Sequence, residues 1–208
     1  MHFLKNILPW LVEAVRPVPA PAAPPKEPDM KTSLRGALEI MSHEAIVTSR
    51  YRDSKNVWTI GVGVTKSAGD VIDPTRFTGE ISVQDAVAMF RRLLPKYEAI
   101  VDRLLDGRKV LQHEYDALVS LAWNAGNIDK GRQTRALVKQ GRIADAINLW
   151  RFDKSLWPRR NKEAKLAETG RYTADYVTVY PASDLGAVLW RKGRRVPLVE
   201  FTGGGGFW

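Results

Sequence analysis

The chain contains no cysteine, and it has no apolar run long enough to cross a bilayer. The first absence excludes disulfide bonds and thiolate chemistry but leaves the redox compartment open. Only three histidines occur, and their spacing is too wide to suggest a metal site. Zinc-finger spacings, RNP-like aromatic motifs and glycine-rich phosphate loops are also missing. We therefore expect neither a metal nor another cofactor, and no nucleic acid as a partner.

What the chain does have is an excess of positive charge. Its 208 residues include 32 Lys and Arg against 23 Asp and Glu, a net charge of +9. Residues 31–172 hold 25 of the basic and 17 of the acidic residues, so this part alone carries +8. A basic domain attracts polyanions such as nucleic acid, anionic lipid or an anionic cell wall, and charge alone does not choose among them.

Two short segments precede the main domain. Residues 1–16 are apolar, but Lys5, Pro9 and Glu13 interrupt them, so they suit neither a membrane span nor a signal peptide. An amphipathic docking or interfacial helix and a terminal helix packed on its own core are both consistent with this pattern. Residues 17–30 hold six of the twelve prolines, which predicts an extended, semi-rigid linker.

Residues 31–172 show the periodicity of a mainly helical domain. A helix is predicted to begin after Ser33 and to end near Glu44, and the alternating residues 56–64 predict a strand. Ser82 predicts the start of a long helix that Pro95 kinks or divides. Further helices are predicted at about 112–124, 132–139, 142–151 and 158–169.

Three polar residues stand out between the first helix and the strand: Glu44 at a helix end, Asp53 in a turn, and Thr59 on a strand. Elements of these kinds can converge on one cleft. Hydrolysis of a glycosidic bond needs an acid for the leaving oxygen and a carboxylate on the other side of the sugar. Judged by residue types alone, however, two solvated carboxylates and a strand threonine are the better interpretation.

The residues around these three change that interpretation. The segment resembles the catalytic signature of the bacteriophage lysozymes of glycoside hydrolase family 24, the lambdoid and T-even muramidases. That signature is a helix ending in Glu-Gly, then Tyr-x-Asp, a turn, and Trp-Thr-Ile-Gly-x-Gly. The residues that match in register are Glu44, Tyr51, Asp53, Trp58, Thr59, Ile60, Gly61 and Gly63. Two residues depart from the pattern, because Ala45 replaces the usual Gly and Val64 stands where a His is common.

Two later blocks extend the resemblance over about residues 31–172. Residues 116–126 resemble the family's central helix, and residues 156–166 resemble its closing Arg-Arg-x-x-Glu helix, although a Gly-Gly hinge before it is shortened. In this closing helix, Arg159 or Arg160 is expected to pair with Glu163 or with a neighbour of the active site. His43 is expected to be a surface or supporting residue rather than a catalyst.

The resemblance implies an α+β, lysozyme-like fold, with a small β-wing at about residues 51–65 beside a mainly helical lobe and a cleft between them. It also implies a muramidase that cuts the β-1,4 bond between N-acetylmuramic acid and N-acetylglucosamine in peptidoglycan. Glu44 would be the general acid in a partly apolar setting, Asp53 the ionised carboxylate, and Thr59 a group that helps to hold the attacking water. Inversion at the sugar is expected, with carboxyl groups roughly 6.5–9.5 Å apart. The substrate-binding residues stay unassigned.

Three functional classes then compete. The first is an endolysin, made in the host cytoplasm and released to the periplasm and cell wall; the second is a lysozyme carried on the phage virion; the third is a non-catalytic wall-binding protein. Residues 173–208 form a C-terminal extension, partly strand-like with a Gly-rich end. We expect any contact with a virion protein or a membrane surface to use residues 1–16 and 173–208. The catalytic core is expected to be monomeric and to fold alone as residues 31–172.

Overall fold

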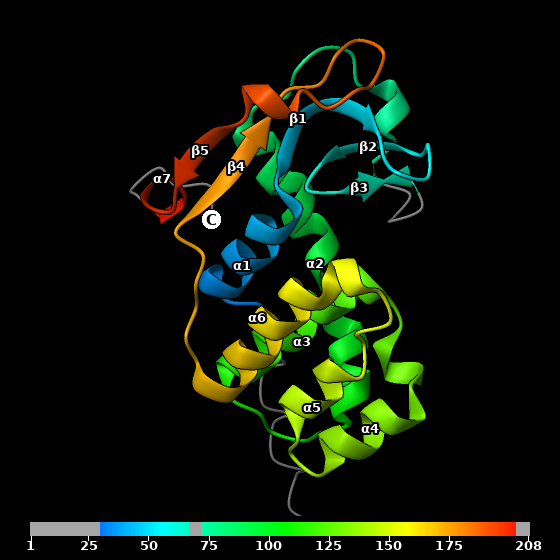
Figure 1. Cartoon of the computed structure of the whole chain (residues 1–208), viewed down its shortest axis with the longest axis vertical. Helices are drawn as coiled ribbons and strands as arrows, with labels where there is room; N and C mark the ends of the chain where they lie inside the picture. Colours follow the sequence, from blue (N-terminus) through cyan, green and yellow to red (C-terminus); the bar gives the residue numbers. More distant parts are fainter. Residues whose placement is uncertain (1–29, 67–71, 203–208) are drawn as a thin grey trace, which may run out of the picture.

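The computed structural model describes residues 30–66 and 72–202 of the chain, and it has two lobes (Figure 1). One lobe is a five-stranded sheet in the order β3-β2-β1-β4-β5, in which β1 and β4 are parallel and the other neighbours are antiparallel. The strands are β1 Ile46–Arg52, β2 Trp58–Gly61, β3 Val64–Thr65, β4 Tyr176–Tyr180 and β5 Arg194–Pro197.

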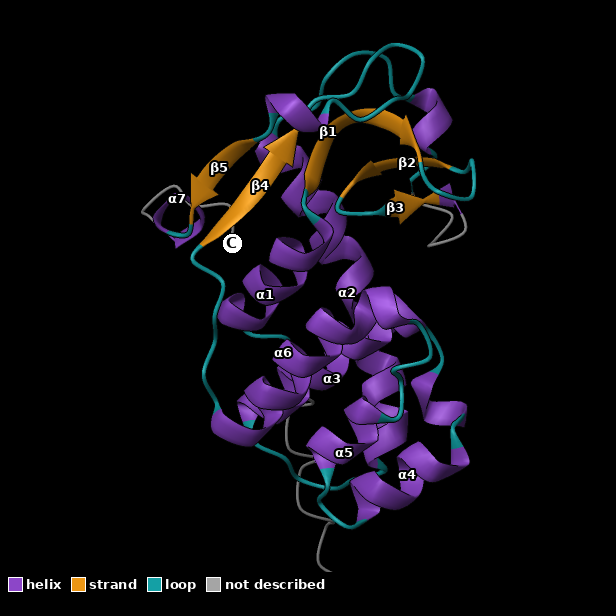
Figure 2. Cartoon of the chain, viewed as in Figure 1, coloured by secondary structure: helices purple, strands orange, loops and turns teal. Residues whose placement is uncertain are grey.

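Helices make up the second lobe and the region between the lobes, as the colouring by secondary structure makes clear (Figure 2). The α-helices are α1 Leu34–Glu44, α2 Val83–Leu105, α3 Gln112–Ala125, α4 Arg132–Lys139, α5 Ile143–Asn148, α6 Trp157–Thr169 and α7 Val199–Thr202. Short 3-10 helices lie at η2 Pro74–Arg76, η3 Ile128–Lys130, η4 Lys154–Leu156 and η5 Trp190–Lys192. Together these elements form an α+β fold with a sheet beside a mainly helical lobe, as predicted.

Local chemistry explains where the two inter-lobe helices begin. Ser33 caps α1 by accepting a hydrogen bond from the Gly36 amide, and Ser82 and Asp85 form a reciprocal capping box at α2. α2 then runs from one lobe to the other as a single helix that contains Pro95, so the chain is not divided there. One face of α2 is buried along most of its length, and this packing outweighs the local cost of the proline.

The sheet is larger than the predicted wing because β1 already starts at Ile46, directly after α1. The first four residues of β1 are buried, so this part of the strand belongs to the interior of the protein. The pairing of β1 with β2 shifts register between Val47 and Tyr51, an irregularity of the kind that bends a strand. β1 accordingly arches over α1 and α2 and carries the chain to the turn at Asp53 (Figure 1).

The C-terminal strands complete this sheet on its other side. β4 lies parallel to β1, and β5 pairs with β4 from Tyr176 opposite Pro197 to Val179 opposite Arg194. The sequence of residues 187–201 predicts a hairpin with its turn at residues 191–195, and this prediction is wrong because β5 pairs with β4. Residues 194 and 195 belong to β5, whose pairing with β4 buries Val196 on the core.

This packing ties the extension to the catalytic half of the chain. Val177, Val196 and Phe201 are all buried in the main core. The carboxylate of Glu39 on α1 accepts hydrogen bonds from the amides of Thr173 and Ala174. The boundary at residue 172 stays a prediction, but the expectation that residues 31–172 fold alone has no support from these contacts.

The segments before the domain cannot be compared with their predictions. Residues 1–29 lie outside the described part of the chain, so the predicted apolar segment and nearly all of the linker at 17–30 are untested. Among the helices that the structure describes, none is both long and apolar enough to span a membrane.

Candidate active site

Glu44 is the last residue of α1, and it lines a pocket formed by α1, α3, η4 and α6. The carboxylate is 23% exposed, and its Oε1 accepts a hydrogen bond from Arg159 Nη1 at 2.5 Å. The pocket has a volume of about 360 Å³ and is lined by His43, Glu44, Asn124, Ser155, Leu156, Pro158, Arg159 and Lys162. This is a charged setting with a defined partner, so the partly apolar surroundings expected for Glu44 are not observed.

Arg159 holds Glu44 because Arg159 is itself fixed by buried groups of α3 and α6. Its Nε donates to Glu163 Oε1 at 2.9 Å, and its Nη2 donates to the Ser120 carbonyl at 3.1 Å. The Ser120 hydroxyl donates to the same Glu163 oxygen at 2.6 Å. Burial opposes the charge of the Arg159 guanidinium, but the carboxylates of Glu44 and Glu163 outweigh it and raise the Arg159 pKa.

Arg160 completes this cluster through Glu163 and Asn124. Its side chain is 1% exposed, and it donates hydrogen bonds to the second oxygen of Glu163 and to Asn124 Oδ1. The predicted pairing of the Arg-Arg segment with Glu163 is thus confirmed for both arginines, and Arg159 reaches the active-site neighbour as well. Asn124 was missed, since an amide on an apolar helix gives no distinct sequence signal.

Asp53 is positioned quite differently, by the turn that follows β1. Its Oδ1 accepts hydrogen bonds from the amides of Lys55 and Val57, both at 2.8 Å. Asn56 within this turn has a φ of 60°, a left-handed conformation that asparagine tolerates better than most residues. Five consecutive residues, 53–57, therefore suffice to fold the carboxylate back over its own turn, and the prediction that Asp53 lies in a turn is confirmed.

Thr59 lies on β2 and is buried, with 2% of its surface exposed. Its Oγ1 donates to the Val57 carbonyl at 3.1 Å, so the hydroxyl oxygen keeps its lone pairs for a further partner. Thr59 is paired with Tyr51 on β1, and residues paired across a ladder have their side chains on the same face of the sheet. Thr59 and Tyr51 therefore share one face of the wing.

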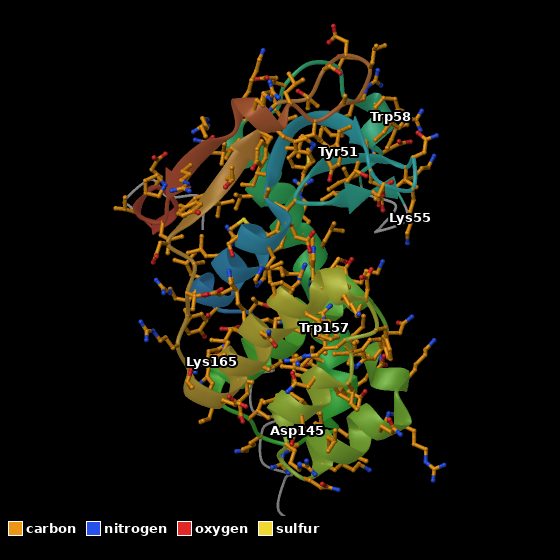
Figure 3. All side chains as sticks on the ribbon, in the orientation of Figure 1. Tyr51, Lys55, Trp58, Asp145, Trp157 and Lys165 are labelled. Carbon is orange, nitrogen blue, oxygen red and sulfur yellow. The ribbon has the colours of Figure 1, made fainter. Side chains whose placement is uncertain are left out.

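The phenol of Tyr51 is influenced by the charges of both carboxylates. Burial, together with the negative charges of Glu44 and Asp53, raises the pKa of Tyr51 to about 12. A phenol that responds to both carboxylates lies within electrostatic reach of both. Figure 3 shows Tyr51 in the sheet lobe, on β1. The sequence match included Tyr51 but gave it no role.

Two further groups enclose Glu44. A Cβ placed on Gly63, in the turn between β2 and β3, would lie 3.7 Å from Glu44 Oε2. The second carboxylate oxygen thus faces the wing, while the first is held by Arg159. Burial and the charge of Glu44 raise the pKa of Tyr97, whose ring packs against Trp123 with centroids 4.5 Å apart.

His43 lines the same pocket but carries no charge near neutral pH. Burial, together with the positive charges of Arg159, Lys162 and Arg160, lowers its pKa to about 3. A histidine that binds no proton near neutral pH has none to donate to a leaving group. The interpretation of His43 as a supporting residue agrees with this environment.

Comparison with protein families gives a match that spans both lobes. The family model described as phage lysozyme matches residues 41–163, which include Glu44, Asp53, Thr59 and Arg159. A SAR-endolysin of Haemophilus phage HP1 (strain HP1c1) is 29% identical over 102 residues, 49% of this chain and 51% of that protein. The alignment thus spans only about half the length of this relative.

Solved structures share the fold. An endolysin from Escherichia coli O157:H7 phage FAHEc1 superposes with a TM-score of 0.63 at 23% identity, covering 71% of this chain and 99% of the other. The muramidase domain of SpmX from Asticaccaulis excentricus gives a TM-score of 0.55 at 27% identity, covering 67% of this chain and 98% of that domain.

Proposed function

This chain belongs to the phage lysozyme family, and from that premise we propose that it is a peptidoglycan muramidase, the lysis enzyme of a phage. The bond cleaved would be the β-1,4 linkage between N-acetylmuramic acid and N-acetylglucosamine. One observation carries the proposal above the others. Glu44 lines a pocket of the helical lobe, with one oxygen held by Arg159 and the other directed toward the wing.

The proposed reaction assigns one step to each group. Glu44 gives its proton to the glycosidic oxygen as the bond from that oxygen to C1 breaks. Water attacks C1 from the opposite face, and its proton passes to Asp53, while Thr59 offers its hydroxyl oxygen to the water. The electron pair of the broken bond leaves with the glycosidic oxygen, and the sugar configuration is inverted.

Two neighbours support this assignment by what they do to the carboxylates. Arg159 fixes the direction of Glu44 Oε1, so Oε2 is the oxygen available to the substrate. Tyr51 stays protonated well above neutral pH and can donate a hydrogen bond to a carboxylate or a sugar oxygen in the cleft.

We further propose that the protein is made in the host cytoplasm and acts on the wall after its release to the periplasm. The endolysin names of the similar proteins support this setting over a role on the virion. The positive charge of residues 31–172 supports attraction to a negatively charged envelope.

The test is the rate at which purified peptidoglycan is solubilised. Glu44→Gln should keep the fold, because the amide oxygen can still accept from Arg159, and should lose activity by about 10²-fold or more. Glu168→Gln, an exposed site on α6, is the matched control and should act like the wild type. Near wild-type activity in Glu44→Gln would remove Glu44 from the reaction.

A further inference from the structure

Lys162 is a cation on the wall of the pocket that holds Glu44. It lies on α6, three residues after Arg159, and lines the pocket together with His43 and Asn124. Lys162 is exposed, unlike the two arginines of the same helix. In the part of the chain that the structure describes, Lys162 has neither an ion-pair nor a hydrogen-bond partner.

The other charged side chains around this pocket have partners among themselves. Arg159 and Arg160 are matched by the two carboxylates of Glu44 and Glu163, all in contact. His43 adds no charge near neutral pH. Lys162 is therefore the charged group among these without an ion-pair partner, and it lines the same pocket as Glu44, the residue that would act on the substrate.

We propose that Lys162 binds a carboxylate on the lactyl-peptide branch of the peptidoglycan substrate and thereby favours glycan that carries this branch. The inference rests on the proposed muramidase function. The branch leaves the muramic ring at O3, two carbons from the C1 atom whose bond is cleaved. A muramic acid residue whose glycosidic oxygen reaches Glu44 thus brings its branch into the same pocket. The flexible ammonium of a lysine is suited to a carboxylate whose position varies.

Long-range attraction by the positive surface is the competing explanation, and α6 offers a control for it. Lys165 is exposed on the same helix, one turn further on, and does not line the pocket. Figure 3 shows Lys165 toward the end of α6 that lies away from Trp157, where the helix begins. Neutralising either lysine changes the net charge equally, so only a local contact can distinguish them.

The experiment measures kcat/KM of the full chain on three substrates. These are intact sacculi, sacculi whose carboxylates are converted to neutral methylamides, and glycan strands from which an amidase has removed the peptides, leaving lactyl carboxylates. Lys162→Met should lower kcat/KM on intact sacculi about three- to fivefold, as expected for one partly exposed charge pair. On neutralised sacculi the same substitution should have no effect. Lys162→Arg should restore most of the loss, and Lys165→Met should match the wild type on each substrate.

The stripped strands show which carboxylate is bound. A persistent effect of Lys162→Met there assigns the lactyl carboxylate, and loss of the effect assigns those of the peptide. Equal losses on intact and neutralised sacculi, or equal effects of Lys162→Met and Lys165→Met, would overturn the proposal. Binding of the same variants to intact and neutralised sacculi in a Glu44→Gln background needs no turnover. It separates failure of this inference from failure of the proposed reaction.

Discussion

Glu44 and Asp53 carry the same functional group, but the chain positions them by opposite means. Glu44 is held by Arg159, 115 positions away, and through it by buried charges on two other helices. Asp53 is held by amides two and four residues further along its own turn. Disturbing the helical side of the cleft should therefore cost folding free energy, whereas disturbing the wing side should cost activity alone.

The most severe way to break the helical side is Glu163→Gln. Glu163 is the shared partner of Arg159 and Arg160, and the change leaves buried positive charge without its counterion. We expect the free energy of unfolding to fall by about 3–5 kcal/mol. Denaturant unfolding measures this, and Glu168→Gln on the exposed face of α6 should stay within about 0.5 kcal/mol of wild type. A small change in Glu163→Gln would mean that the cluster does not hold the site.

On the wing side, Asp53→Asn should separate activity from stability. The amide oxygen of asparagine can still accept from Lys55 and Val57, so the unfolding free energy should change by less than about 0.5 kcal/mol. Turnover should fall about 10- to 100-fold with little change in KM, because the charge is lost but the turn is kept. Steady-state kinetics on purified peptidoglycan checks this. If stability fell as much as it does in Glu163→Gln, the contrast between the two sides would be wrong.

The pH dependence of stability sharpens the comparison at His43. In the unfolded chain this histidine takes up a proton near pH 6.5, whereas in the folded protein its pKa is about 3. Between these values the unfolded state binds more protons, so lowering the pH destabilises the fold, with a slope of up to about 1.4 kcal/mol per pH unit. Unfolding measured from pH 7 to pH 4 should show a shallower slope in His43→Gln. An unchanged slope would contradict the buried, neutral state of His43.

The smallest of these expected effects lies at Ala45, where the helical side of the cleft joins the wing side. Ala45 links α1 to β1 with φ 62° and ψ 178°, a region that almost only glycine occupies. Ala45→Gly should relieve this strain and raise the unfolding free energy by about 1 kcal/mol, the strain relieved exceeding the added flexibility of the unfolded chain. Thermal unfolding measures the shift, and Ala144→Gly, inside α5, should shift in the opposite direction. A lower melting temperature in Ala45→Gly would show that the backbone at Ala45 is not strained.

The same contrast explains how far the sequence could predict the molecule. The turn of Asp53, the caps of α1 and α2 and most helix positions depend on neighbouring residues, so local patterns were enough. The resemblance also placed the Arg-Arg segment near the active site. The parallel pairing of β1 with β4 joins Val47 to Tyr180, and no local signal encodes which distant strand completes a sheet edge. The pairing of Glu44 with Arg159, and the charged setting it creates, lies equally outside local patterns.

The most direct test of the central claim is the identity of the new reducing end in the products. Peptidoglycan digested by the full chain is reduced with borohydride, and the fragments are examined by mass spectrometry. A muramidase that uses Glu44 as its acid leaves N-acetylmuramic acid at the reducing end, so muramitol should appear with the wild type and be almost absent with Glu44→Gln. Products ending in N-acetylglucosamine or in anhydromuramic acid, or equal muramitol from both proteins, would contradict the account.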